Sequence, residues 1–339
     1  MKFSFLILLA GISVGSAEPA NVGDVKTYLL STLAKVQAAA TDYQANARQY
    51  EALAQSDPAG ALAAHRPELR RLLAAMRENY KAMDSFGYEL VEGIVAGVPV
   101  LADFDIYLDA GVPKAEAGAD VTVAPVTLKT SKGTSIDQEG SLFTHLVEPL
   151  LWGTSQKHLV PADLDGDGKI AAREALPQAD VLVAIADDLH KKVGGLIAAS
   201  EAWQPTLEDL MGAIVTVTPT FAGYFEDWKE SRYAAEKSGH FNAVSRVSDM
   251  RGIMGSVEVI YRAILPQVQA KDAALAKSIT SGFTGIMSFI DRVEAREKMG
   301  RITEAQIDEL GNQAKARADK LVPQVEQAAA MLQVKMKDA

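Results

Sequence analysis

The sequence predicts an all-α protein of two packed four-helix-bundle-like halves joined by an irregular connection. Apolar residues recur every three or four positions over long stretches at both ends of the chain. Strand-like patterns are confined to a short middle segment, and only 6% of the 339 residues are aromatic. Long helices with short joints and few aromatic residues are typical of helical bundles.

The first half is predicted to begin with a helix of about thirty residues that starts near Asp24 and ends before Asp57-Pro58. A second helix is expected at 61–83, with Pro67 either near its first turn or kinking it. A short helix at 88–92 then frays into an acidic loop that reaches Asp109. The apolar stripe of the first helix is Leu29, Leu33, Val36, Ala40, Tyr43, Ala47 and Tyr50.

The middle of the chain, residues 111–140, contains prolines and a β-branched run but no helical period, so we expect a connection with a short strand or two. Helical periodicity resumes after residue 178. A capping box at Thr303–Gln306 starts the last helix, which Pro323 should kink. The other helices of this half are expected at 181–199, 205–214, 219–235, 257–264 and 283–293.

Residues 1–17 have the pattern of a secretory signal peptide: Lys2, an apolar stretch from 3 to 14, and small residues before a cleavage site after Ala17. No later apolar run approaches the roughly 20 residues that span a bilayer, so we expect a periplasmic or secreted chain that is not membrane-embedded. The absence of cysteine excludes thiolate ligands and a lipidated N-terminal cysteine. A formal net charge of -10 argues against nucleic acid as a partner.

The run from Asp163 to Glu174 fits a twelve-residue EF-hand calcium loop. Gly168 stands at its sharp turn, and the predicted calcium ligands are Asp163, Asp165, Asp167, the carbonyl of Lys169, and Glu174. Pro161 and Pro177 argue against long flanking helices. No second loop of this kind occurs in the sequence, so we interpret residues 156–178 as a connection braced by structural calcium rather than a calcium switch.

A second constellation is the pair His145 and Glu148, which would share one face of a helix and could bind one metal ion. The same spacing is also common in ordinary hydrogen-bonded pairs. Pro149 lacks the amide that would bond to the carbonyl of His145, so the helix is expected to kink or stop there.

The segment that carries this pair resembles the His-x-x-Glu motif of the imelysin-like family, which includes the EfeO and EfeM iron-uptake proteins. Trp152 matches an aromatic residue that follows in the family, whereas Phe143 replaces a glycine that the family often has. Weaker similarity extends over most of the mature chain. The resemblance implies that four residues bind the transition metal: His145, Glu148, Glu89 and Asp105, with Glu92 and Asp103 as alternatives to the last two.

Three carboxylates and one imidazole would suit iron, manganese or zinc, and a ligand charge of about minus three would favour Fe(III). The resemblance implies an exported protein that captures iron, or another transition metal, within a first bundle at 18–155. It would pass the metal to a membrane permease or another uptake component, and the second bundle would occupy 179–339.

Two alternatives stay open. The first is an imelysin-like metallopeptidase. The sequence lacks a His-Glu-x-x-His motif, a Gly-x-Ser-x-Gly elbow and a cysteine nucleophile. The lack of these motifs favours a binding protein over an enzyme. The second is a protein that binds an anionic polysaccharide through calcium.

Overall fold

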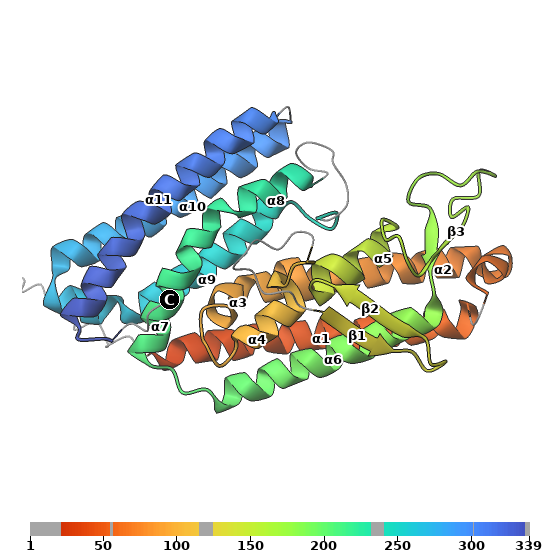
Figure 1. Cartoon of the computed structure of the whole chain (residues 1–339), viewed down its shortest axis with the longest axis horizontal. Helices are drawn as coiled ribbons and strands as arrows, with labels where there is room; N and C mark the ends of the chain where they lie inside the picture. The colour runs from red at the N-terminus through yellow and green to blue at the C-terminus, as the bar shows by residue number, and fades with distance from the viewer. Residues whose placement is uncertain (1–21, 55–56, 115–124, 232–240, 301, 336–339) are drawn as a thin grey trace, which may run out of the picture.

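The computed structural model of the chain describes residues 22–54, 57–114, 125–231, 241–300 and 302–335, so the predicted signal peptide lies outside the described residues. Long helices dominate the described part and the strands are short, which confirms the all-α prediction. Figure 1 shows two sets of long helices that run at an angle to each other and meet near α3 (Glu89–Val95). Helix α3 packs on α9 (Arg246–Lys271) at this junction.

The first set is built around α1 (Gly23–Ala54), which packs against α2 (Pro58–Met83) on one side and α6 (Ala179–Ala202) on another. Every residue of the predicted apolar stripe of α1 is fully buried, as its spacing predicted. Helix α2 is distorted at His65, two residues before Pro67, where the proline ring and its missing amide disturb the preceding turn. The boundary between the two bundles, expected at residue 179, stays a prediction. That boundary assigns α6 to the second bundle, although α6 packs along α1 in the first set of helices.

The second set contains α7 (Leu207–Val217), α8 (Tyr224–Glu230), α9, α10 (Ala273–Met299) and α11 (Glu304–Met331). The single helix expected at 219–235 is wrong for its described residues: a 3₁₀ turn, Thr218–Ala222, precedes α8, which ends at Glu230. Residues 232–235 lie outside the described part of the chain. The capping box at Thr303 is confirmed, and α11 continues through Pro323. Helix α9 likewise continues through Pro266 and starts earlier than its apolar period indicated.

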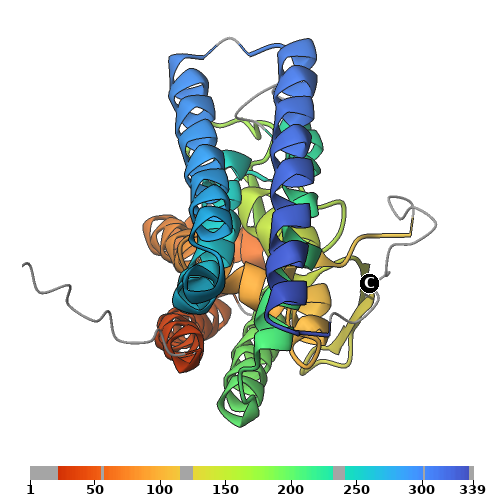
Figure 2. The same ribbon diagram turned by 90° about the vertical axis from the view of Figure 1, so that its left-hand side faces the viewer.

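Helices α10 and α11 stand side by side as a long pair that projects from the layer containing α1 and α6 (Figure 2). Among the described helices, only α10 has the length and apolar composition that would allow it to cross a membrane. This differs from our expectation that no segment after the predicted signal peptide would be long and apolar enough. The apolar residues of α10 pack against α9 and α11 in this fold. Length and apolarity are also properties of the core helix of a packed bundle.

The described residues of the two predicted connections, 111–140 and 156–178, form one small antiparallel ribbon each. The first pairs β1 (Pro125–Lys129) with β2 (Ser135–Glu139) and aligns Leu128 with Ile136, which confirms the expected short strands. The second pairs β3 (Leu159–Pro161) with β4 (Ala175–Pro177) and closes the Asp163–Glu174 loop at its base. The loop is therefore held by strands and not by the two helices of an EF-hand.

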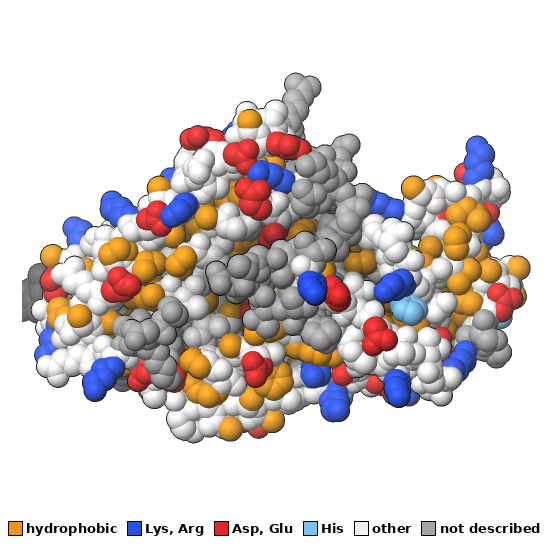
Figure 3. Space-filling model, viewed as in Figure 1, with side chains coloured by type: hydrophobic (Ala, Val, Ile, Leu, Met, Phe, Trp, Pro, Cys, Tyr) orange, Lys and Arg blue, Asp and Glu red, His pale blue; other side chains and the backbone are white. Residues whose placement is uncertain are grey.

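Charged side chains are dispersed over the face of the molecule that Figure 3 draws. On the face drawn in Figure 3, Lys and Arg side chains lie among Asp and Glu side chains and do not form a stripe. Several acidic residues are buried in the interior, among them Asp84, Glu89, Asp109 and Asp249, near the contact between α3 and α9.

Candidate metal centre

Three π-helical turns converge on the junction between the two helix sets. They are η1 (Asp84–Tyr88), η2 (Ile106–Ala110) and η3 (Phe143–Val147), and each directly precedes or follows a short α-helix. The π-helix is rare and occurs mostly as isolated turns, frequently at functional sites. Three such turns around one point mark this region as the candidate site.

The first π turn brings Asp84 and Glu89 together. These residues are five apart, and on an α-helix they would point about 140° away from each other. In η1 the amide of Glu89 donates to the carbonyl of Asp84, which is the i to i+5 bond of a π turn, so both carboxylates reach the same cavity.

Asp109, from η2, completes a group of three buried carboxylates. Each of Asp84, Glu89 and Asp109 offers an oxygen that lies within 4.8 Å of those of the other two. All three line a cavity of about 10 Å³, which is close to the space that one water molecule needs. The hydroxyl of Thr144 donates to Asp109 at 3.0 Å, so the third π turn, η3, contributes a hydrogen bond to the group.

Two oxygens of this group have no hydrogen-bond partner. Asp84 Oδ1 and Glu89 Oε2 are buried without a donor, whereas Asp84 Oδ2 accepts from the hydroxyl of Ser85 at 3.1 Å. The side chains of Asp84 and Glu89 belong to residues that are 7% and 1% exposed. A buried carboxylate oxygen without a donor is costly, so the arrangement demands a proton or a cation.

Burial raises the pKa of Glu89 well above its ordinary value, and the neighbouring charges of Glu92, Asp249 and Asp109 add to this effect. Burial and the charge of Asp109 likewise raise the pKa of Asp84. Arg246 acts in the opposite direction on both groups. Without a further cation, these carboxyls therefore hold protons at a pH where exposed carboxyls are ionised.

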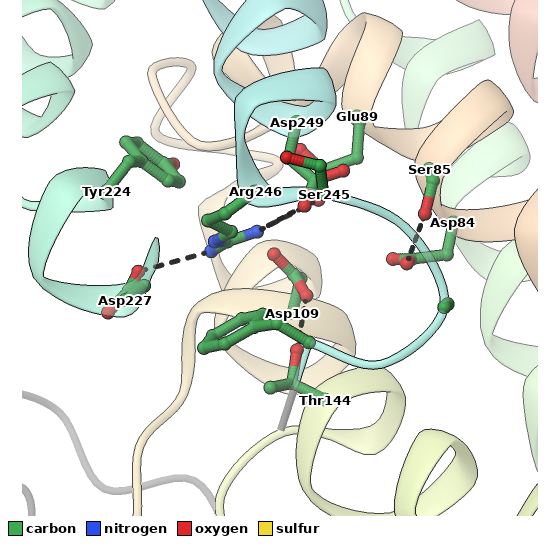
Figure 4. A network of polar contacts seen from close by, with 12 residues as sticks. Asp84, Ser85, Glu89, Asp109, Thr144, Tyr224, Asp227, Ser245, Arg246 and Asp249 are labelled. Carbon is green, nitrogen blue, oxygen red and sulfur yellow. Dashed lines mark hydrogen bonds and ion pairs between the residues drawn. The ribbon is translucent and has the colours of Figure 1, made fainter. Parts of the chain in front are cut away.

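Arg246 is the buried cation next to the group, and Figure 4 shows it between the carboxylates and α8. Its guanidinium lies 3.2 Å from Asp249, 3.5 Å from Glu89 and 3.5 Å from Asp227. The aromatic rings of Tyr224 and Phe241 lie close to the guanidinium of Arg246. The tyrosine ring centre is 4.7 Å and the Phe241 ring centre 4.5 Å from the guanidinium carbon.

The two helix sets approach closely beside the carboxylates because glycines remove side chains at the contact. A Cβ atom on Gly93 of α3 would lie 2.4 Å from the Ser256 hydroxyl of α9, and a Cβ on Gly252 of α9 would lie 3.0 Å from the backbone of Glu89. The amide of Gly93 donates to the Ser256 hydroxyl at 3.0 Å. These contacts fix α3, and with it Glu89, against the first half of α9.

Of the four transition-metal ligands expected from the sequence, Glu89 and Glu148 line the cavity. Glu148 is 2% exposed, and it accepts backbone amides from Phe241 at 3.1 Å, from Ala243 at 2.7 Å and from Asn242. Burial raises the pKa of Glu148 to about 7, and these amides limit the rise. Glu148 therefore carries a structural task in addition to any ligand role.

The other two expected ligands, His145 and Asp105, are not among the described residues that line the cavity. The Nδ1 atom of His145 lies 3.1 Å from the Ser141 amide and 3.0 Å from its hydroxyl. Pro149 neither stops nor sharply breaks the helix. Instead, the turn before it widens into η3, and this removes the α-helical geometry on which a shared face for His145 and Glu148 depended. That this histidine binds metal stays a prediction.

Asp105 is buried and accepts the Tyr88 hydroxyl at 2.7 Å. Glu92 is also buried, accepts the Tyr224 hydroxyl at 3.0 Å, and keeps Oε2 without a partner. Asp103 is exposed, which makes it the weakest of the open alternatives. Asp84, Asp109 and Asp249 were not expected from the sequence.

The Asp163–Glu174 loop brings Asp163, Asp165 and Glu174 together, with one oxygen of each within 4.8 Å of the others. Asp163 accepts the amides of Gly166 and Gly168 at 2.6 and 3.0 Å, and Gly168 has the left-handed φ of 84° that the turn requires. The amide of Lys169 donates to Asp167 at 2.8 Å. Three of the predicted calcium carboxylates therefore point into one small space.

Comparison with known proteins agrees with the resemblance noted in the sequence. The sequence profile of the imelysin family, peptidase family M75, matches residues 30–332. A search among curated proteins gave no match. The family match covers both helix sets and every described residue of the buried carboxylate group, and the chain therefore belongs to the imelysin family.

Proposed function

We propose that this protein binds a transition metal ion, in particular iron(III), at the buried carboxylates Asp84, Glu89 and Asp109. It would do so outside the cytoplasm and pass the ion to a membrane permease or another component of iron uptake. The observation that carries this proposal is the pair of buried oxygens, Asp84 Oδ1 and Glu89 Oε2, that have no donor within the described structure.

Charge and ligand chemistry support iron(III) over softer ions. Three carboxylates within 4.8 Å of one another form a hard oxygen site, and one guanidinium balances only part of their charge. A trivalent cation would neutralise the three carboxylates and supply the missing partners of their buried oxygens. Glu148, and His145 in the preceding turn, remain further candidate ligands.

Iron binding to the purified mature protein tests this proposal. We expect one equivalent of iron, supplied as iron(III) citrate, to stay with the protein through gel filtration, as measured by elemental analysis. Asp84→Asn and Glu89→Gln should each lower the affinity at least about tenfold. Glu68→Gln is the matched control, because Glu68 is an exposed carboxylate on α2 that does not line the cavity. Unchanged affinity in both site variants would refute the proposal.

His145→Ala and Glu148→Ala separate the possible ligand sets. Loss of affinity in His145→Ala would mean that the loaded site extends to the histidine. Affinity that is unchanged in His145→Ala but lost in Asp84→Asn would confine the site to the buried carboxylates.

The family name raises peptidase activity as a second candidate. The cavity of about 10 Å³ has no room for a peptide bond and its flanking residues. Metal-dependent cleavage of a peptide library that Glu89→Gln abolishes would favour the enzyme, and iron retention without cleavage favours the binding protein.

We also propose that the Asp163–Glu174 loop binds calcium as a structural brace. Its support is the convergence of Asp163, Asp165 and Glu174 within a loop whose sequence matches the EF-hand pattern. Calcium should raise the melting temperature of the protein, and Glu174→Gln should remove this effect. A melting temperature that is independent of calcium would refute the brace.

A further inference from the structure

The carboxylate of Glu148 is held by three consecutive backbone amides from a distant part of the chain. Phe241 donates to Oε2 at 3.1 Å, and Asn242 and Ala243 both donate to Oε1, the latter at 2.7 Å. Phe241 has a left-handed φ of 56°, which turns its amide toward the same point as the next two. Successive amides in such a turn form a concave anion-binding nest, and here the anion is the Glu148 side chain at the start of α5 (Glu148–Trp152).

The same segment covers the buried carboxylates. Phe241, Ala243, Val244 and Arg246 line the cavity together with Asp84, Glu89 and Asp109. Figure 4 shows the backbone of this segment curving past the carboxylates into the first turn of α9. These residues form part of the wall of the cavity, and we call the segment from Phe241 to Arg246 the 241–246 closure.

A second contact connects the closure to the Asp163–Glu174 loop. Arg173, the residue before Glu174, donates from Nη1 to Asn242 Oδ1 at 3.3 Å. Asn242 is fully buried and Arg173 is exposed, so this bond joins the exposed loop to a buried side chain of the closure.

The backbone of Arg173 is also fixed against the end of α5. Arg173 has a left-handed φ of 71°, and a Cβ atom at Gly153 would lie 2.3 Å from its carbonyl oxygen. Gly153 itself has a φ of 72° and ends the helix that carries Glu148. The loop therefore contacts both the end of α5 and the closure.

We propose that the 241–246 closure is latched over the buried carboxylates by Glu148, and that Arg173 couples this latch to the ion state of the Asp163–Glu174 loop. Glu148 and Arg173 are positioning residues in this proposal, which rests on the metal site and on the calcium loop proposed above. A cation in the loop would fix Glu174 and hence the adjacent Arg173. This would hold Asn242 in the nest and slow the release of an ion from the cavity.

Amide hydrogen exchange in metal-free and calcium-loaded protein tests the latch without any use of iron. We expect the amides of Asn242 and Ala243 to exchange about tenfold more slowly with calcium bound. Arg173→Ala should abolish this calcium effect. Arg66→Ala is the matched control, because Arg66 contacts the same loop, 3.7 Å from Asp163, and the described structure records no contact between it and the closure. An equal calcium effect in wild type and Arg173→Ala would overturn the coupling.

Release of iron(III) to an excess of a strong chelator is the second measurement. Calcium should slow release from the wild-type protein about tenfold, and release from Arg173→Ala should be fast and independent of calcium, with little change in the equilibrium occupancy. Release that calcium affects equally in both proteins would overturn the proposal. Failure to bind iron would refute the proposed function alone, because the exchange experiment would still decide whether the latch exists.

Discussion

Replacing Glu92 by glutamine should stabilise the metal-free protein, and the gain should depend on pH. Glu92 is 4% exposed, and its Oε2 has no donor. Burial, followed by the charge of Asp109, raises the pKa of this carboxyl from 4.5 to about 7. Glutamine keeps the acceptor for the Tyr224 hydroxyl and removes the charge that burial penalises.

The size of the effect follows from this pKa. Because the folded-state value lies above the unfolded one, the protonated carboxyl contributes stability that is fully present below about pH 4.5 and is lost as the pH rises through about 7. Ionising the group in the folded protein costs on the order of 3 kcal/mol, of which less than about 1 kcal/mol is already lost near pH 5. Glu92→Gln should therefore stabilise the protein by about 2 kcal/mol more near pH 8 than near pH 5.

Urea denaturation of metal-free protein, with chelator present, measures this difference. Glu68→Gln is the matched control, since Glu68 lies exposed on α2 and its replacement should change the unfolding free energy by less than about 0.5 kcal/mol at either pH. A gain for Glu92→Gln that is equal near pH 5 and near pH 8 would refute the argument that an uncompensated charge is buried here.

Three further predictions concern packing and metal binding. Gly93→Ala should destabilise the protein by about 1–3 kcal/mol in urea denaturation, because the new methyl group would overlap the Ser256 hydroxyl. Gly255→Ala, whose Cβ would meet nothing within 4 Å, should instead be neutral or stabilise by up to about 1 kcal/mol. Trp228→Ala should cost about 3–5 kcal/mol in the same assay, because this side chain is fully buried. Iron affinity should rise as the pH increases toward about 7, where the raised pKa of Glu148 lies, and calorimetry in buffers of different ionisation enthalpy should detect proton release on binding.

The long helices could be predicted from the sequence because their apolar period is set by packing. Every predicted core position of α1 is buried, and the capping box of α11 forms as its residues indicated. The errors lie where a local feature departs from the ideal period. The α8 region was overextended because Gly223 and the 3₁₀ turn interrupt it, and α9 began before its apolar stripe became regular.

The candidate site could be predicted only in part, and the reason is geometric. Glu89 and Glu148, two of the four ligands that the family resemblance implies, line the cavity, and their binding of metal stays a prediction. Asp84 was missed because a residue five positions before Glu89 lies on another face of an α-helix, and only the π turn η1 aligns the two. Asp109 was read as the end of an acidic loop, although η2 orders it inside the fold. No pattern in the sequence predicts such π turns, because their positions depend on the tertiary contacts around them.

The same geometry explains why the buried carboxylates are informative about function. A sequence selected only for stability would not widen three helical turns in order to bring Asp84, Glu89 and Asp109 within 4.8 Å of one another in the interior. Each π turn departs from regular α-helix geometry, and the cluster buries carboxylates away from water. Both features raise the free energy of the folded protein, and one bound ligand would offset both. Arg246 offsets part of the charge, yet the donor-free oxygens of Asp84 and Glu89 remain. A cation at this point would resolve the conflicts together, and the Gly93 contact that presses α3 on α9 would then hold both helix sets in the geometry that the ion requires.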